Sequence, residues 1–305
     1  MDEDSLVLAL CREVTTIPPK FWQHIETLQD MRFAWCRNMT EVPETIGHFY
    51  ELQRLSFEEC PALQTVPASV GMLRSLTTLA FHKCDSLTRL PAEVGDLAAL
   101  ETLEIMWCPA LQALPDTVGK LCQMQRLQMS RCDALSALPD SLPPRLQQLS
   151  LHACHALCAI PAHRGIETLY VSQCPQVTDI PDVPSIRNLE LHRCDAMQHL
   201  PNQMPDLRSL RISMCPSIAA LPNRLGTSRR LVAIIVHDCR ALTVLPFMSC
   251  MAAEVLELQE MRRPPPEVVR AGCHAVQQYM HAEHRAWNVL LLRLWYEEYI
   301  TAMPS

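Results

Sequence analysis

Residues 76–100 read LTTLAFHKCDSLTRLPAEVGDLAAL, and the pattern in this stretch decides the fold. Leu79 and Phe81 stand one residue apart ahead of Cys84, and this period of two predicts a short strand with alternate side chains buried. After the cysteine, apolar residues return at every third position up to Pro91. Proline cannot donate to a strand ladder and fixes its own φ, so it predicts the end of an extended segment.

The same unit recurs along most of the chain. Its cysteine returns every 20 to 25 residues, and one such cysteine stands at each of positions 11, 36, 60, 84, 108, 132, 154, 174, 194, 215 and 239. Repeats of this length pack only on their neighbours, and each buries apolar side chains that the next cannot cover alone. The sequence therefore predicts about eleven strands side by side in one parallel sheet.

The unit LxxLxLxxCxxLxxLP is similar to that of the leucine-rich repeats, and the resemblance covers roughly residues 5–260. Early copies such as residues 76–100 resemble the longer repeats of plant resistance-type and Ras-group-related proteins, whose convex side carries a short helical turn before Gly-x-Leu. Copies from Cys132 to Cys215 are shorter and resemble those of bacterial secreted effectors. The resemblance implies an α/β leucine-rich-repeat solenoid over residues 1–260, with eleven to twelve repeats, a curved parallel sheet and an irregular or short-helical convex side.

Residues 261–305 depart from the repeat and resemble the C-terminal cap of plant intracellular Ras-group-related repeat proteins. Apolar residues at helical spacing follow the three prolines at 264–266, as a helix covering the end of the core would require. No capping helix precedes the first repeat at Leu6, which leaves open whether the chain is complete or begins inside a larger protein. The residues that match the cap are Pro265, Pro266, Glu267, Val268, Gly272, Ala275, Val276, Tyr279 and Met280.

Composition excludes several classes of function. The net charge of −7 comes without a basic stripe, which argues against a nucleic-acid partner. No run approaches the roughly 18 apolar residues of a membrane helix, and the acidic start MDEDSLVLALCREV does not resemble a signal peptide. The fifteen cysteines are odd in number and mostly share one repeat position, which favours reduced thiols. We expect a cytoplasmic protein.

Four histidines, His82, His152, His192 and His237, stand two residues before repeat cysteines and raise the possibility of a metal site. Strand alternation points each histidine away from its cysteine, and the histidines lie about 10 to 14 Å apart at a strand spacing of about 4.8 Å. Zinc ligand atoms lie only about 2.0 to 2.3 Å from the metal. Ordinary exposed side chains, with no metal and no cofactor, are the favoured interpretation.

Disulfide formation and nucleophilic catalysis are two other roles that the cysteines could have, and neither is favoured. Those of adjacent strands would come near disulfide distance, but a buried row of thiols packs as small hydrophobic groups. Cys273 beside His274 could suggest a nucleophile, although Cys273 occupies an apolar position of the cap motif. Asn38-Met39-Thr40 matches the N-glycosylation sequon, but it would not be glycosylated in the cytoplasm. No glycine-rich loop or nucleophile elbow occurs, so we expect no enzymatic activity.

The residues one, two and four places before each cysteine are expected to form the concave face. Their charges are mixed, and tryptophan, tyrosine, methionine and arginine among them are enriched at protein interfaces. The two tryptophans could instead be scattered surface aromatics. The predicted partner-binding residues are Arg32, Trp35, Glu58, His82, Lys83, Glu104, Met106, Trp107, Arg131, His152, Tyr170, His192, Arg193, Arg211 and His237.

These residues predict a monomeric, non-catalytic scaffold or recognition module that binds a protein partner on its concave face. Signalling or innate immunity is the setting that the resemblance implies. An alternative is the substrate-recognition arm of a larger ligase or kinase assembly, whose catalytic part would be encoded elsewhere. Side chains at variable positions set the ligand of such a fold, so the fold does not name the partner.

Overall fold

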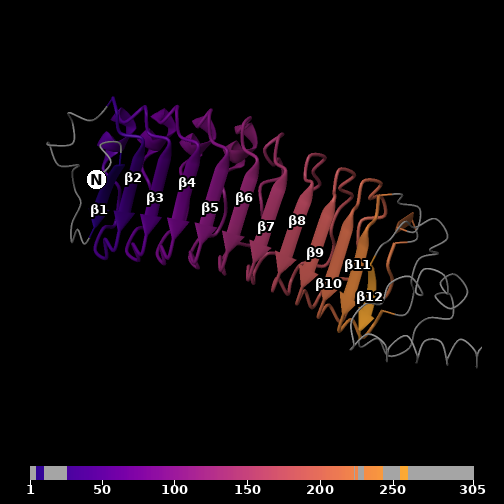
Figure 1. The fold of residues 1–305 in the computed structure, drawn as a ribbon. Coiled ribbons are helices and arrows are strands. Elements are labelled where there is room, and N and C mark those ends of the chain that lie inside the picture. Colours follow the sequence, from indigo (N-terminus) through magenta and orange to yellow (C-terminus); the bar gives the residue numbers. More distant parts are fainter. Residues whose placement is uncertain (1–4, 10–25, 223, 226–229, 243–254, 260–305) are drawn as a thin grey trace, which may run out of the picture.

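The structure is a computed structural model that describes residues 5–9, 26–222, 224–225, 230–242 and 255–259. In this part of the chain, twelve parallel strands form one sheet in chain order (Figure 1). The strands are β1 (Ser5–Ala9), β2 (Asp30–Ala34), β3 (Arg54–Glu58), β4 (Thr78–His82), β5 (Thr102–Met106), β6 (Arg126–Ser130), β7 (Gln148–His152), β8 (Thr168–Ser172), β9 (Asn188–His192), β10 (Ser209–Ser213), β11 (Ala233–His237) and β12 (Val255–Gln259).

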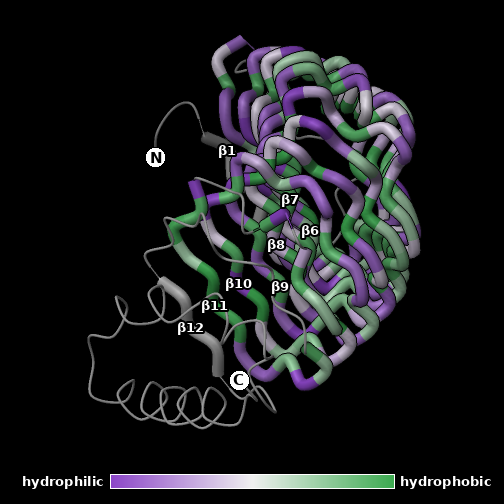
Figure 2. The backbone as a smooth tube through the Cα atoms, turned by 90° about the vertical axis from the view of Figure 1, so that its right-hand side faces the viewer, coloured by the Kyte–Doolittle hydropathy of each residue, from purple (hydrophilic) through white to green (hydrophobic). Residues whose placement is uncertain are grey.

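The predicted leucine-rich-repeat solenoid is confirmed. Every strand pairs in register with the next, so that equivalent repeat positions stand side by side, as Leu79 does with Leu103 and Phe81 with Ile105. The second and fourth residues of β2 to β11 are buried in one continuous core. In Figure 2, which is viewed at 90° to Figure 1, apolar segments follow one another from repeat to repeat.

A column of phenylalanines marks the early core. Phe33, Phe57 and Phe81 occupy the same position on β2, β3 and β4, and none is exposed. Adjacent ring centroids are 5.1 Å apart, with the ring planes within 9° of parallel. Because the sheet sets the distance between repeats, each ring fills the gap that its neighbours leave, and the column locks three repeats together.

The convex side carries short helical turns in the early repeats, as predicted. They are 3-10 turns, namely η2 (Glu44–His48), η3 (Ala68–Met72), η4 (Ala92–Asp96) and η5 (Asp116–Lys120). Between residues 138 and 222 the described convex segments contain no such turn. Proline-rich stretches such as PDVPSI favour extended backbone there, which explains the change.

Glycine lets adjacent 3-10 turns approach closely. A Cβ placed on Gly95 would lie 2.5 Å from both the carbonyl oxygen and the Cβ of Thr117 in the next turn. We expect Gly95→Ala to lower the free energy of unfolding by about 1 to 3 kcal/mol, the usual cost of overpacking. Urea denaturation measures this, with the exposed neighbouring change Asp96→Ala as control. A Gly95→Ala protein as stable as the control would contradict the packing described.

His163, in the loop between β7 and β8, couples stability to pH. Its Nε2 donates to the carbonyl oxygen of Pro143 at 2.9 Å, while its Nδ1 accepts from the backbone N–H of Gly165 at 3.0 Å. Only the neutral ring makes both bonds, and burial lowers the pKa of His163 below its ordinary value of about 6.5.

The unfolded chain therefore binds a proton at His163 more readily than the native protein does. Stability from this residue is fully present above a pH of about 6.5 and is lost as the pH falls below that value and through the lower pKa of the native protein. We expect the wild-type free energy of unfolding to drop from pH 7.5 to 5.5, and His163→Gln to reduce that drop. The exposed change His199→Gln serves as the control. An unaltered pH dependence in His163→Gln would refute this role.

The cap predicted at residues 261–305 lies outside the described residues, and so does Cys273. The boundary at residue 260 therefore stays a prediction. Within the described residues, no helix has the length and apolar character needed to cross a bilayer.

Candidate functional site

Each strand from β2 to β11 is followed by a single residue with left-handed backbone, at φ values between 50° and 60°. This conformation costs an L-amino acid about 1 to 2 kcal/mol, and glycine or asparagine usually adopts it. None of these residues is glycine or asparagine, so nothing in the sequence predicts the turn. We call them the turn row: Trp35, Glu59, Lys83, Trp107, Arg131, Ala153, Gln173, Arg193, Met214 and Asp238.

Hydrogen bonds hold the turn row in this conformation. The backbone N–H of Trp107 donates to the carbonyl oxygen of Ser130, at the end of the next strand, over 2.7 Å. The same bond recurs from Trp35 through Met214, with lengths up to 3.0 Å. The ladder thus continues one residue beyond each strand, and the side chains of the turn row are carried on a fixed edge of the sheet.

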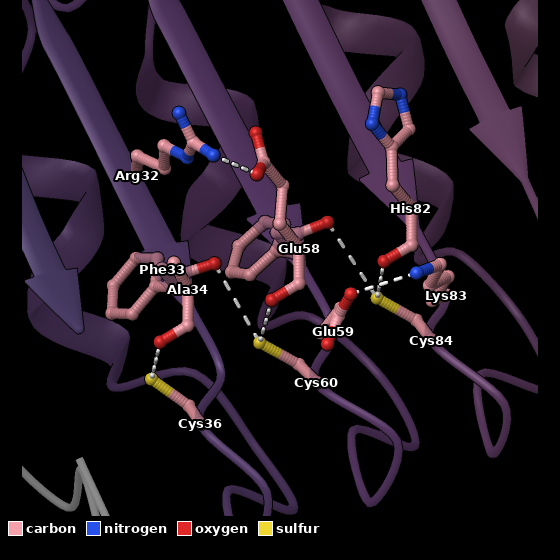
Figure 3. Close-up of polar contacts among 11 residues, drawn as sticks. Arg32, Phe33, Ala34, Cys36, Glu58, Glu59, Cys60, His82, Lys83 and Cys84 are labelled. Carbon is pink, nitrogen blue, oxygen red and sulfur yellow. Dashed lines mark hydrogen bonds and ion pairs between the residues drawn. The ribbon is translucent and has the colours of Figure 1, made fainter. Parts of the chain in front are cut away.

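The repeat cysteines fasten the same edge from inside. The thiol of Cys84 donates to the carbonyl oxygen of His82 in its own repeat and to that of Phe57 in the preceding repeat, each at 3.8 Å (Figure 3). Cys60 bonds in the same way to Glu58 and Phe33. The single S–H of Cys84 or Cys60 is thus shared between carbonyl oxygens of two repeats and links them, although a thiol is a weak donor.

The predicted burial of the repeat cysteines is confirmed for the ten from Cys36 to Cys239, which the structure holds as buried free thiols. The interaction with the neighbouring thiol of Cys132 is the main reason that the pKa of Cys154 rises to about 12. Burial raises the pKa of Cys239. Because the thiolate is the reactive form, Cys154 and Cys239 are poor nucleophiles.

Two further cysteines, Cys122 and Cys158, are exposed. We expect iodoacetamide to label both within minutes in the native protein, while the ten buried repeat cysteines react only after denaturation, because neither reagent nor hydroxide reaches them. Peptide mapping by mass spectrometry reads each site separately. Labelling of Cys84 or Cys108 at the rate of Cys122 would contradict the buried column.

The solvent side of the sheet is formed by the first, third and fifth residues of each strand, which we call the strand face. It contains the predicted residues Arg32, Glu58, His82, Glu104, Met106, His152, Tyr170, His192, Arg211 and His237. The residue directly before each cysteine is predicted on the same face as the strand residues, but it lies outside the strand. The left-handed turn places Trp35, Lys83, Trp107, Arg131 and Arg193 one position beyond the strand end.

Sequence reasoning also missed the first residue of each strand. Arg54 opens β3 and forms an ion pair with Asp30 of β2, with 2.9 Å between Nε and Oδ2. Arg126 opens β6, and its Nε donates to the hydroxyl of Thr102 over 3.1 Å. If the alternation of the strand is extended by two more residues toward its start, it places both arginines on the solvent side of the sheet.

The turn row forms a line of contacts along the sheet edge. Lys83 Nζ lies 2.7 Å from Glu59 Oε1, and this bond is the main cause of the lowered pKa of Glu59 (Figure 3). The guanidinium of Arg131 stacks on Trp107, 4.0 Å from the ring centroid. Such a contact orients an exposed tryptophan and leaves its other face free for a ligand.

Exposed apolar surface gathers on this row. The described large hydrophobic residues with substantial exposure include Trp35 at 44%, Trp107 at 46% and Met214 at 38%, all from equivalent turn positions. The remaining exposed ones, Tyr50, Met72 and Val232, lie elsewhere. Trp35, Trp107 and Met214 follow β2, β5 and β10, so they are aligned along one edge of the sheet without forming one continuous patch.

The strand-face histidines stand apart from one another. The register puts Ser172 between His152 and His192, and Ser213 between His192 and His237. His192 Nδ1 lies 2.6 Å from the hydroxyl oxygen of Ser213, and His82 Nε2 is 3.5 Å from Glu104 Oε2. Among the described residues, no three His, Cys, Asp or Glu side chains come together in a way that could hold a metal ion.

No family model and no curated protein matches the chain. Solved structures with detectable similarity include the leucine-rich repeat domain of the type III effector XCV3220 (XopL), at 19% identity and a TM-score of 0.44, covering 84% of this chain and 76% of that one. A Leptospira interrogans LRR protein, LIC12759, shows 19% identity, a TM-score of 0.34 and coverage of 87% of each chain. An internalin from Listeria monocytogenes shows 11% identity and a TM-score of 0.42, with 83% and 82% covered.

Proposed function

We propose that the chain is a non-catalytic module that binds a protein partner through the concave side of its sheet, using the strand face and the turn row together. The observation that carries the proposal is the alignment of Trp35, Trp107 and Met214, which are exposed and stand at equivalent turn positions. Tryptophan, methionine and arginine are enriched in the cores of protein interfaces, where a few residues supply most of the binding energy.

The rigidity of this surface supports a binding role. Hydrogen bonds to the next strand fix the backbone of every turn residue from Trp35 to Met214. Stacking against Arg131 further restricts the Trp107 ring. A surface whose side chains are held before binding loses less conformational entropy when a partner docks.

Reduced repeat cysteines support a reducing compartment such as the cytoplasm, because thiols in oxidising compartments tend to form disulfides. We propose that the module acts there as a monomer, without cofactor, metal or nucleic acid. We also propose that the chain is related to plant Ras-group-related and resistance-type proteins. Such a relationship would imply a role in signalling or innate immunity.

Affinity capture from the source cell tests the proposal. The bait is the wild-type chain, compared with the triple variant Trp35→Ala/Trp107→Ala/Tyr170→Ala and with Tyr50→Ala/Met72→Ala, which removes exposed apolar side chains outside the site. We expect a specific protein to be captured by the wild type and by the control variant, and lost by the triple variant. Capture retained by the triple variant and lost by the control would overturn the proposal.

A further inference from the structure

The charges on the strand face and turn row differ between the two ends of the sheet. Along β2 to β5, every lysine and arginine at these positions has a carboxylate partner. Arg32 pairs with Glu58 (Figure 3), and the other pairs are Arg54 with Asp30 and Lys83 with Glu59. This end neutralises its own positive charge and has little left for a ligand.

Along β6 to β10, the same positions carry Arg126, Arg131, Arg193 and Arg211, all exposed. In the described part of the chain, none of the four lies within ion-pair distance of a carboxylate. Their recorded contacts are with uncharged groups: the Thr102 hydroxyl for Arg126, the Trp107 ring for Arg131 and the Met214 sulfur for Arg193, at 3.1 Å.

Glu190 on β9 is the single carboxylate among the strand-face and turn-row residues of β6 to β10, all of which the structure describes. The register sets it beside Arg211, yet the two side chains form no ion pair. The remaining positions are mostly serine, threonine, asparagine and glutamine, with His152 and His192 among them. This end of the surface therefore offers positive charge and neutral hydrogen-bonding groups within a chain of net charge −7.

The surroundings of His152 agree with this pattern. Burial is the main cause of the lowered pKa of His152, and the nearby charges of Arg131, His192 and His155 lower it further. The basic groups near His152 are thus Arg131 after β6, His192 on β9 and His155 in the loop after β7. Ser130 and Ser172, its neighbours in the sheet, are uncharged. A negatively charged ligand would relieve this repulsion.

We propose that the strand face and turn row of β6 to β10 bind an acidic, extended peptide segment of the protein partner, with Arg126, Arg131, Arg193 and Arg211 contacting its carboxylates. The inference rests on the proposed function and names the chemistry of the partner. Five strands at about 4.8 Å spacing span about 19 Å, which about six extended residues cover. Arginine suits the role because its planar fork of donors matches a carboxylate.

A peptide fits this surface better than a nucleic acid does. The four arginines are distributed over five strands and two rows, with Glu190 among them, and they do not form the continuous basic stripe that follows a phosphate backbone. A short RNA is therefore the competing ligand in the test.

The probe is a fluorescein-labelled peptide in which about six glutamates alternate with serines, long enough to cross the patch. Its matched control carries glutamine in place of glutamate, and fluorescence anisotropy measures both. We expect binding of the acidic peptide that weakens as salt rises, with no binding of the control peptide. Arg131→Gln and Arg211→Gln should each weaken binding about threefold to tenfold. Arg145→Gln removes an exposed arginine outside the strand face and turn row and should leave binding unchanged.

Acidification provides a second readout. We expect the acidic peptide to bind more tightly at pH 5.5 than at pH 7.5, because bound carboxylates favour the protonated ring of His152. His152→Gln should reduce this difference. Arg211→Gln should weaken binding at both pH values and keep the difference.

Three results would overturn the inference: no acidic-peptide binding up to about 1 mM, equal binding of the glutamine peptide, or tighter binding of an oligouridylate of similar length. Failure of the proposed function looks different. If the captured partner is lost with the triple aromatic variant but binds Arg131→Gln/Arg211→Gln normally, the concave-side site stands and the acidic-segment inference alone is wrong.

Discussion

Phe57→Ala is expected to lower the apparent free energy of unfolding by about 3 to 5 kcal/mol, the range for truncating a buried phenylalanine. Phe57 has no exposed surface, and its ring stacks on Phe33 and on Phe81. Truncation leaves a cavity between two rings that the sheet cannot bring together, because the strand spacing is fixed by hydrogen bonds. Urea denaturation followed by circular dichroism measures the change.

Two control variants locate the effect in the column. Phe57→Leu keeps most of the volume and should cost about 1.5 kcal/mol or less. Ser56→Ala alters the adjacent residue on the opposite face of β3 and should leave stability within about 0.5 kcal/mol of the wild type. A Phe57→Ala protein that unfolds like Ser56→Ala would show that the phenylalanine column does not join the repeats.

Trp107→Ala is expected to weaken binding of the captured partner by about 2 kcal/mol or more, close to thirtyfold in Kd. The ring is 46% exposed and held against Arg131, so it is available as an anchor with little entropy left to lose. Folding should be unaffected, since the side chain lies outside the core and alanine adopts the left-handed turn at the same cost. Isothermal titration calorimetry gives the Kd, and urea denaturation checks the fold.

Lys120→Glu is the matched surface control for Trp107→Ala. Lys120 ends the convex turn η5 and is exposed, so the change reverses a charge on the outside of the arc. We expect it to leave the Kd within about twofold of the wild type. Normal binding by Trp107→Ala together with loss of binding by Lys120→Glu would place the partner on the convex side.

The sequence predicts the repeat and its core because both follow from periodicity. Residues equivalent to Leu79, Phe81 and Cys84 recur in register from β2 to β11, so the pattern of one repeat identifies the buried side of these ten strands. The short helical turns of the early repeats and the extended convex segments of the later ones also follow from glycine and proline positions, as Gly95 illustrates.

The turn row could not be predicted, because its geometry is imposed by the sheet. Trp35, Lys83 and Met214 have no preference for left-handed backbone, and they adopt it since their N–H groups then reach the next strand. Charge pairing was equally hidden. The register places Arg54 beside Asp30 and Arg211 beside Glu190, but only the first of these two pairs forms an ion pair. This difference distinguishes the two ends of the surface.

Site-specific photo-crosslinking distinguishes a partner on the concave side of the solenoid from one on the convex side. A benzophenone amino acid replaces Tyr170, on the strand face of β8, or Lys120, on the convex turn, and each protein is irradiated with the captured partner. We expect an efficient covalent adduct from position 170 and none from position 120, because a benzophenone reacts only with groups it touches. An adduct from position 120 with none from position 170 would contradict this expectation and put the partner on the outside of the solenoid.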